Sequence, residues 1–317
     1  MCIRDRFLIK LLEFPILFLG ATSKTSPALY SLMNYADIKL GTWYPKGGFH
    51  KLVEAMVSLA KEKGVKIYNN EEVVEFNYKN NAISHVITTK KTYDADYVIC
   101  GADYHHIDQN ILIKKYRNYS PSYWGKKTMA PSALIFYIGI NKKLKNIKHH
   151  CLFFDKDFNN HSNEIYNTPR WPSDPLFYAS FSSKTDPETA PKNHENMVLL
   201  IPIAPGLEDN KLIRNKYFEL IISRFEKITR QSIRNNIIYN KSYAIRDFKK
   251  DYNSFKGNAY GLANTLFQTA IFKPSIRNKK LKNLFFCGQL TVPGPGVPPA
   301  IISGGIVAKE VKKEIKS

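Results

Sequence analysis

The residues best suited to chemistry lie near the carboxyl end of the chain, within Leu281–Val311. An apolar run, Leu284–Cys287, ends at Gly288, and small and aliphatic residues resume at helical spacing over Ala300–Val307. The loop between them is built mainly from prolines and glycines: Pro293, Gly294, Pro295, Gly296, Pro298 and Pro299. Glycines let a main chain approach a ligand closely, and the N–H groups at a helix start suit an anionic group such as a phosphate. The alternative is a sharp turn that only packs a C-terminal helix.

No motif for a protein nucleophile accompanies this loop. The sequence contains no G-x-S-x-G, no catalytic Cys/His signature and no H-E-x-x-H. Asp94 and Asp96 form a D-x-D pair at the start of an expected strand, where a solvated edge is the simplest interpretation. The missing acid–base constellation favours chemistry performed by a cofactor.

The cysteines are isolated from one another, with no C-x-x-C and no convincing Cys/His ligand spacing: Cys2, Cys100, Cys151 and Cys287. This pattern disfavours both a structural zinc site and a disulfide framework, and it fits a reducing cytoplasm. The two cysteines that end apolar strands, Cys100 and Cys287, are most simply small buried thiols.

Three blocks of the chain resemble the phytoene desaturase family, the bacterial carotenoid desaturases of the flavin amine oxidoreductase superfamily. Gly288, Thr291 and Pro293–Pro298 stand where that family ends a strand in Gly and continues with a Thr-x-Pro-Gly-x-Gly-Val-Pro loop. The blocks Gly41–Met56 and Asp251–Gly288 are similar to two further family segments, and all three follow in family order.

The resemblance lacks one part. The family opens with a strand and a G-x-G-x-x-G turn that holds a dinucleotide pyrophosphate, and no such motif occurs in this sequence. We therefore expect a C-terminal fragment of a longer enzyme, one that by itself holds FAD weakly and is inactive. Met1–Arg6 shows no family likeness. A short protein that has lost its flavin is the alternative.

The resemblance implies an α/β and α+β fold. The expected fold contains a truncated FAD-binding domain, which is Rossmann-like and of the glutathione-reductase type and lacks its N-terminal βαβ unit. A substrate domain with a mainly antiparallel sheet and helices interrupts it. We expect a helical segment of the substrate or membrane-contact region at 1–40, FAD-binding parts at 41–103 and 275–317, and a substrate-binding domain at 104–274. The two FAD-binding parts should meet in space.

Residue patterns predict the elements of these segments. Apolar residues at three-to-four spacing predict helices over His50–Lys63 and Leu212–Ile228. Two strands around the turn sequence YKNNA predict a hairpin. The other strands are expected at Val65–Tyr68, Tyr97–Cys100, Ser132–Ile140, Cys151–Asp155, Leu176–Ser182, Met197–Ala204 and Ile237–Ala244.

The resemblance also implies which residues contact FAD, largely through the main chain. They are Val73, Gly101, Gly288, Gln289, Gly294, Gly296 and Val297. A core valine in a strand is an equal interpretation of Val73. Trp43 and Tyr44 are expected near the flavin ring or a substrate tunnel, with aromatic core packing as the alternative. Pro299 replaces the commoner family Gly, and no residue is assigned a catalytic role.

The implied activity is desaturation of a carotenoid precursor, phytoene, to more conjugated carotenes such as lycopene. In this family a hydride leaves a saturated carbon for flavin N5, a neighbouring proton is lost, and oxygen or a quinone reoxidises the flavin. Rivals are a hydroxycarotenoid desaturase, a carotenoid isomerase, an amine oxidase, or a flavin-free basic membrane-associated module. The Pro and Gly loop disfavours the aromatic cage of an amine oxidase.

The charge balance is strongly basic, with 47 Lys and Arg against 27 Asp and Glu and a formal net charge of +20. The basic residues are scattered and form no groove-reading motif, so nucleic-acid binding is not expected. Either a solvated basic surface or attraction to anionic lipid explains them. Phe7–Gly20 is apolar but too short to span a membrane, and it suits a core helix or a shallow membrane contact. We expect a cytoplasmic protein, peripheral on the inner face of the membrane.

Overall fold

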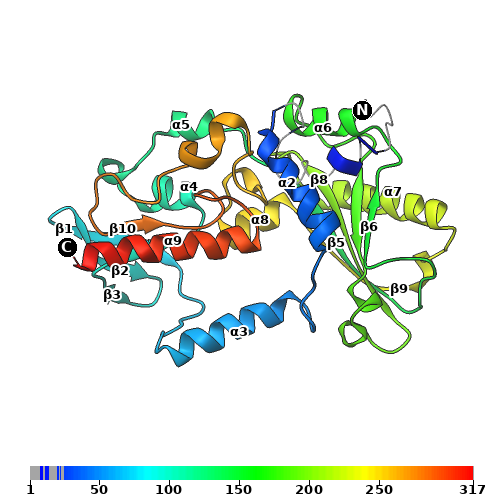
Figure 1. Ribbon diagram of the computed structural model, residues 1–317, viewed down its shortest axis with the longest axis horizontal. Coiled ribbons are helices and arrows are strands. Elements are labelled where there is room, and N and C mark those ends of the chain that lie inside the picture. Colours follow the sequence, from blue (N-terminus) through cyan, green and yellow to red (C-terminus); the bar gives the residue numbers. More distant parts are fainter. Residues whose placement is uncertain (1–7, 10, 14–19, 21, 23–24, 317) are drawn as a thin grey trace. The chain divides into compact units, whose positions relative to one another are not determined.

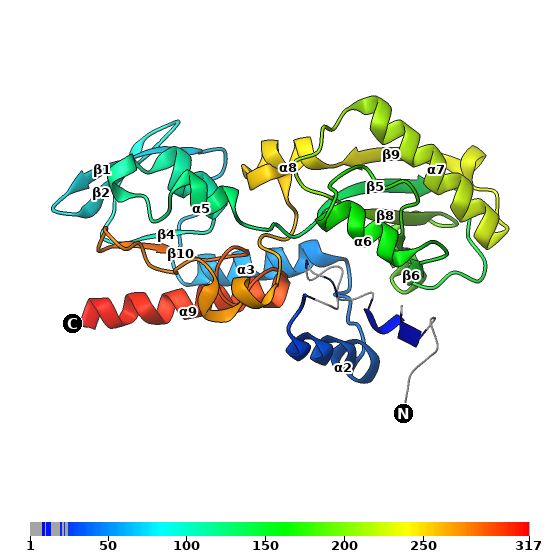
Figure 2. The same ribbon diagram turned by 90° about the horizontal axis from the view of Figure 1, so that it is seen from above.

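The chain folds into two compact units (Figures 1 and 2). The computed structural model describes residues 8–9, 11–13, 20, 22 and 25–316. Unit 1 comprises Ser31–Ile67 and Ser132–Arg246, with residues from 1–12. Unit 2 comprises Tyr68–Pro131 and Asp247–Ser317, with residues from 13–30. The predicted segments 1–40, 41–103 and 104–274 therefore each contribute to both units, whereas 275–317 lies within unit 2. The roles assigned to the four segments stay predictions.

Unit 1 is built on a five-stranded antiparallel sheet in the order β6-β7-β8-β5-β9. Its strands are β5 (Ser132–Ile140), β6 (His150–Phe153), β7 (Phe177–Ser180), β8 (Glu195–Ile203) and β9 (Ile237–Tyr243). All five agree with the predicted strands to within two residues, because alternating apolar residues mark a sheet with one buried face. The central strands β5 and β8 bury most of their length.

The helix α7 (Lys211–Thr229) packs its stripe of Tyr217, Ile221, Ile222 and Phe225 into the same core as the sheet. Asn210 caps its start by accepting the Ile213 N–H at 3.0 Å. The other helices of this unit are α2 (Leu32–Tyr35), α3 (Phe49–Glu62) and α6 (Phe158–Tyr166).

Unit 2 contains two small sheets. The first is the antiparallel sheet of β1 (Val73–Lys79), β2 (Ala82–Thr88) and β3 (Thr92–Asp94). Asn80 and Asn81, both with positive φ, form the predicted hairpin turn between β1 and β2. In the second sheet, β4 (Val98–Cys100) pairs in parallel with β10 (Leu284–Phe286). The two predicted FAD-binding parts thus meet along these strands.

The C-terminal helix α9 (Val297–Lys316) follows β10 after the Pro and Gly loop. It lies beside β10, and Val307 and Val311 pack on Phe285 (Figures 1 and 2). The remaining helices of this unit are short, α4 (Tyr104–His106) and α5 (Pro121–Gly125), while α8 (Ile245–Tyr252) contains the boundary between the units. The core of unit 2 surrounds Trp124, Phe286 and Leu284, all fully buried.

Some predictions failed or fall outside the described residues. Val65–Tyr68 is not a strand, because this exposed segment finds no pairing partner among the described residues. The α3 helix forms as expected, yet none of its described side chains is buried. Most of Phe7–Gly20, and all of Met1–Arg6, lie outside the described residues. No helix that the structure describes is long and apolar enough to cross a membrane.

Candidate functional site

A cavity of about 710 Å³ opens in unit 2 where β4 and β10 end. Its wall combines the ends of these strands, the loop before α9, and the segment after α8. Its lining includes Gly101, Asp103, Gly288, Gln289, Gly296 and Val297. The volume lies within the range of small-molecule and cofactor pockets in proteins.

Two glycines form the floor at the carboxyl ends of the paired strands. Gly101 follows β4 and Gly288 follows β10. Gly288 has φ +103, a conformation that side chains rarely adopt, and a Cβ there would lie 3.7 Å from the Gly101 carbonyl oxygen. The carboxyl ends of parallel strands are the usual location of ligand sites in α/β folds. A side chain at Gly288 would therefore strain the backbone, whereas a Cβ at Gly101 would lie 3.8 Å from Cys287 Sγ, an ordinary contact distance.

A closed ring of hydrogen bonds fixes the loop to the start of α9. The Gly288 N–H donates to Ser303 Oγ at 3.0 Å, and Thr291 Oγ1 donates to the Gly288 carbonyl at 2.9 Å. The Ser303 and Thr291 hydroxyls lie 3.0 Å apart and share a further hydrogen bond. Because Thr291 and Ser303 are both buried, these bonds hold Gly288 firmly below the first turns of the helix.

The helix start itself faces the cavity through Gly296, Val297 and Ala300. The Ala300 N–H donates to the Gly296 carbonyl at 2.9 Å, which makes Gly296 the residue that opens α9. Pro298 and Pro299 carry no N–H group and the Ala300 N–H is already bonded, so the Val297 N–H and the helix dipole are what make this end of the cavity favour an anionic ligand.

A buried acid, Asp103, also lines the cavity. Asp103 caps α4 by accepting the His106 N–H at 3.0 Å, and it also accepts the Phe255 N–H at 3.2 Å. Burial raises the pKa of Asp103 to about 6, although these N–H donors act in the other direction. The carboxyl group therefore changes charge near neutral pH, beside Gly101 and Tyr104.

A buried amine lies behind the loop. Lys273 is 6% exposed, and its Nζ donates to Asn264 Oδ1 at 3.2 Å. A Cβ built on Gly294 would lie 3.3 Å from Lys273 Cε. Burial, together with repulsion from Lys127, lowers the pKa of Lys273 to about 8. Gly294, with φ +137, is thus the point at which this lysine contacts the Pro and Gly loop.

The structure brings five of the predicted cofactor-contact residues to one cavity: Gly101, Gly288, Gln289, Gly296 and Val297. Gly294 is buried in the same loop but contacts Lys273 and does not line the cavity. Val73 begins β1 and packs partly buried against the core of unit 2. Its expected contact with FAD stays a prediction.

The predicted substrate residues lie in unit 1. Trp43 is 86% exposed, and its Nε1 donates to the Leu40 carbonyl at 3.2 Å. Tyr44 packs edge-to-face on His149, with ring centroids 4.8 Å apart. His149 Nδ1 pairs with Thr185 Oγ1 at 2.6 Å. Tyr44 thus belongs to an aromatic cluster, whereas Trp43 lies open to solvent.

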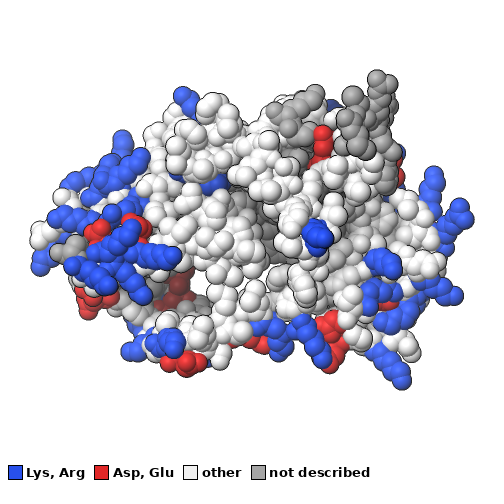
Figure 3. All heavy atoms as spheres, in the orientation of Figure 1, with Lys and Arg blue, Asp and Glu red and all other residues white. Residues whose placement is uncertain are grey.

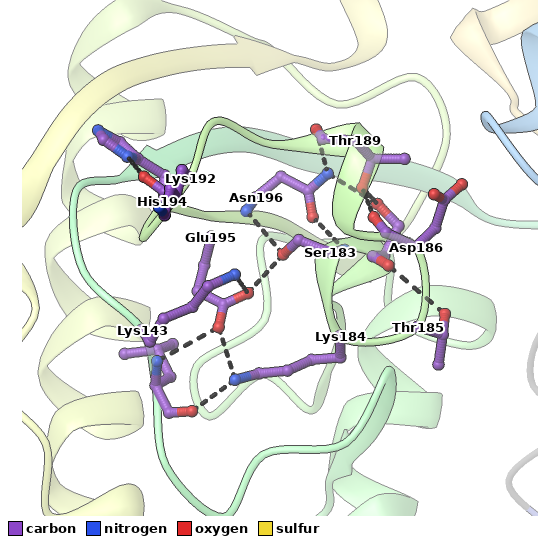
Figure 4. Close-up of polar contacts among 12 residues, drawn as sticks. Lys143, Ser183, Lys184, Thr185, Asp186, Thr189, Lys192, His194, Glu195 and Asn196 are labelled. Carbon is purple, nitrogen blue, oxygen red and sulfur yellow. Dashed lines mark hydrogen bonds and ion pairs between the residues drawn. The ribbon is translucent and has the colours of Figure 1, made fainter.

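A second polar cluster lies in unit 1 around Glu195, at the start of β8 (Figure 4). The Glu195 carboxylate is fully buried and pairs with Lys184 Nζ at 2.6 Å, with Lys143 Nζ 3.7 Å away. Ser183 Oγ donates to it as well. Burial alone would raise the pKa of Glu195, but the bonds from Lys184 and Ser183 outweigh it and hold the pKa below its usual range.

The same cluster holds a loop that precedes α3. Asp186 Oδ2 accepts the Gly47 N–H at 2.6 Å, and Asn196 Nδ2 donates to Ser182 Oγ at 2.7 Å (Figure 4 shows Asp186 and Asn196). Both carboxylate oxygens of Glu195 have partners, so this network stabilises the end of the sheet.

Basic side chains gather at the C-terminal end of α9, where Lys309, Lys312, Lys313 and Lys316 are exposed, and over the neighbouring β1–β3 sheet (Figure 3). Acidic side chains are mixed among them. Within the part of the chain that the structure describes, no group of His, Cys, Asp and Glu could hold a metal ion.

Residues 6–312 match the sequence profile of a family described as flavin containing amine oxidoreductase. The chain belongs to this family. FAD is the cofactor that this membership implies, and the predicted superfamily is confirmed.

Relatives and solved structures agree with this assignment. A protein of Haloarcula japonica named carotenoid 3,4-desaturase is 37% identical over 306 residues, 96% of this chain and 62% of the relative. A 4,4'-diapophytoene desaturase of Staphylococcus haemolyticus is 30% identical over 97% of this chain and 63% of the relative. A crystal structure of an oxidoreductase from Methanosarcina mazei matches with a TM-score of 0.67 at 17% identity, over 97% of this chain and 65% of that one. The chain spans about three fifths of the length of these two relatives.

The cavity fits a flavin at its glycine-lined end. Gly101 and Gly288 leave the strand ends free of side chains, and the positive end of the α9 dipole, with Gly296 and Val297 in the lining, suits an anionic group. The family motif pointed to Gly288, and the resemblance implied Gly101. Sequence reasoning missed Asp103 and Lys273, because no spacing rule connects a residue after β4, or one 21 positions before Gly294, with the Pro and Gly loop.

Proposed function

We propose that the protein carries out FAD-dependent desaturation of a carotenoid. The observation that carries the proposal is the cavity at the ends of β4 and β10, whose lining includes Gly288 and Gly296 of the loop that resembles the carotenoid desaturase motif. Family membership and the names of the relatives support the same activity. When bound, FAD supplies a two-electron acceptor for oxidation of a carbon–carbon single bond.

The residues of the chain would act by binding and by excluding water. The main chain at Gly101 and Gly288 admits a planar ring close to the strand ends, and Gly296 and Val297 present N–H groups where negative charge develops. Leu290 and Tyr260 contribute apolar surface to the same wall. Because a polyene delocalises positive charge along its own chain, no dedicated protein base is assigned.

Two substrates are candidates. The motif resemblance favours phytoene, which is converted to more conjugated carotenes. The 37% identity to a protein named carotenoid 3,4-desaturase, against 30% to the diapophytoene enzyme, favours 3,4-desaturation of a carotenoid that is already conjugated. Oxygen or a quinone would accept the electrons. Attachment to the inner face of a membrane belongs to this proposal and is supported by the basic charge of the chain.

The test is pigment analysis in cells that accumulate either phytoene or lycopene and express the complete gene. New absorption at longer wavelength, with loss of hydrogen seen by mass spectrometry, is expected from one of the two strains. Gly288→Val should abolish both the pigment and the flavin absorbance of the purified protein. Gly64→Ala, at an exposed glycine with φ +78 and no neighbour within 4 Å, should leave both unchanged. No new pigment from either strain would overturn the proposal.

A further inference from the structure

Lys273 is a buried cation without an anionic partner among the described residues. The side chain is 6% exposed, and Asn264 Oδ1, at 3.2 Å, is the one hydrogen-bond partner that the structure gives its Nζ. An ammonium group carries three N–H donors, so the neutral amide oxygen satisfies only part of its capacity.

Burying such a group is costly, because an ammonium loses its hydration and regains little from one amide. The buried charges of unit 1 avoid this cost by ion pairing, as Lys184 does with Glu195. The nearest charged side chain recorded for Lys273 is another cation, Lys127, which repels it. An arrangement of this kind is expected where a negative partner arrives from outside the protein.

The position of Lys273 indicates where that partner would lie. Its Cε and Nζ meet Gly294, at 3.3 and 3.4 Å from an ideal Cβ. The next residues of the loop, Pro295 and Gly296, line the cavity, whereas Lys273 is not among the described lining residues. The ammonium therefore lies against the loop at Gly294, next to the loop residues that line the cavity.

We propose that Lys273 is a positioning residue for the flavin, holding the Pro293–Val297 loop from behind and adding positive charge to its site. This inference rests on the proposed function, because it takes FAD as the occupant of the cavity. The flavin ring becomes more negative on reduction, so a cation behind the loop stabilises the reduced form more than the oxidised form. The lysine thus raises the midpoint potential of the bound flavin.

The experiment uses the flavoprotein purified from expression of the complete gene. Sulfite binding to the oxidised flavin is the main readout, because the product is an anion that a nearby cation stabilises. Lys273→Met keeps the length of the side chain and removes its charge, and it should weaken sulfite binding by roughly tenfold and lower the midpoint potential. Lys273→Arg, which retains the charge, should restore much of the affinity.

Lys127→Met is the matched control, because it removes a neighbouring lysine that is more exposed and lies over the Tyr123 ring at 4.5 Å. It should change sulfite affinity by less than about twofold, since Lys127 is only half-buried and solvent screens part of its charge. The thermal stability of each variant without flavin reports whether it folds. Lys273→Met should be at least as stable as the parent protein, because a methionine has no charge to desolvate.

The outcomes separate the two claims. A parent protein that retains no flavin overturns the proposed function, and this inference with it. A second outcome overturns the role of Lys273 alone. In it the parent binds flavin normally and Lys273→Met folds, but the sulfite affinity of the variant stays within twofold of the parent and its midpoint potential is unchanged. Equal effects of Lys273→Met and Lys127→Met would also overturn it, because they would indicate a general surface charge effect.

Discussion

The two units treat buried charge differently. In unit 1, fully buried carboxylates pair with cations, as Glu195 does with Lys184, Glu164 with Arg170 and Asp209 with Arg214. Bonds from Arg214 and the Arg246 N–H hold the pKa of Asp209 below its usual range, although its burial acts in the opposite direction. Each pair is neutral as a whole and anchors a loop to the sheet or to a helix.

In unit 2, buried charges are held by neutral groups. Asp108 accepts the Asn118 N–H at 2.7 Å and Trp124 Nε1 at 3.1 Å, and Asp103 accepts backbone N–H groups. Lys273 has the amide of Asn264. The ion pairs recorded among the described residues of this unit, such as Arg277–Glu314, are at least partly exposed.

The difference indicates which unit is prepared for a ligand. A structural region gains stability when each buried charge is paired with an opposite charge. A buried charge near a cavity that has no such partner lowers stability, but its electric field can act on a bound ligand. Asp103 lines the cavity and Lys273 contacts its loop at Gly294, so two of these three buried charges lie at or beside the candidate flavin site, whereas Asp108 is not among the described lining residues. The following predictions test this contrast, beginning with the largest expected effect.

Breaking the Glu195 pair should destabilise unit 1 strongly. Glu195→Ala leaves Lys184, 19% exposed, without its anion, and we expect a loss of about 3 kcal/mol in the free energy of unfolding. Denaturant titration measures it. Glu188→Ala removes an exposed pair with Lys46 and should change stability by less than about 0.5 kcal/mol. Similar losses in both variants would remove the distinction between buried and surface pairs.

The neutral side chain of Asn283 should stabilise unit 2 nearly as strongly as the Glu195 pair stabilises unit 1. Asn283 is buried and accepts the Ile83 N–H at 2.8 Å, while its amide donates to the carbonyls of Ile83 and Asp96 at 2.7 and 2.8 Å. Asn283→Ala leaves these backbone groups unpaired, so we expect a loss of about 2–3 kcal/mol in unfolding free energy. Asn77→Ala, on the exposed side of β1, is the control and should be within about 0.5 kcal/mol of the parent. If Asn283→Ala lost no more unfolding free energy than Asn77→Ala, the buried amide of Asn283 would not stabilise this unit.

The burial of Lys273 should appear in the pH dependence of flavin-free protein. Its folded pKa of about 8 lies below the unfolded value of 10.5, so the unfolded state binds more protons between these values. Stability should therefore rise with pH from about 8 to 10.5, by an amount on the order of 2 kcal/mol, and Lys273→Met should lose this rise. Lys127 faces the same amine and stays present in both proteins. Parallel stability curves for the two proteins would contradict an uncompensated buried cation.

Asp103 should make the smallest contribution to the pH dependence of stability, and its slope should be opposite to that of Lys273. Its folded pKa of about 6 exceeds the model-compound value of 3.8, so the folded state binds more protons and stability falls as pH rises from about 4 to 6. Asp103→Asn keeps the helix cap and should lose this fall, on the order of 1 kcal/mol. Burial lowers the pKa values of the neighbouring His105 and His106, which titrate in both proteins, so the difference between the two curves isolates Asp103. A difference that is constant over this range would rule out its titration.

Local patterns were sufficient to predict most elements. The alternation over Ser132–Ile140 and the stripe over Leu212–Ile228 mark β5 and α7 because each element buries one face with a fixed period. The Gly288 and Gly296 positions could also be predicted, since a backbone that must adopt positive φ restricts the residue type. Val65–Tyr68 shows the limit of this reasoning, because an apolar run becomes a strand only where a partner edge is present.

By itself, the sequence determined the family motif, the strands and helices, and the glycines at the ends of β4 and β10, all of which depend on neighbours within a few residues. Only the tertiary structure decided that Asp103 lines that cavity, that Lys273 lies against its loop at Gly294, and that Lys273 has Asn264 in place of a carboxylate. The reason is physical: burial and charge pairing depend on which distant segments the fold brings together, and no local period in the chain encodes that choice.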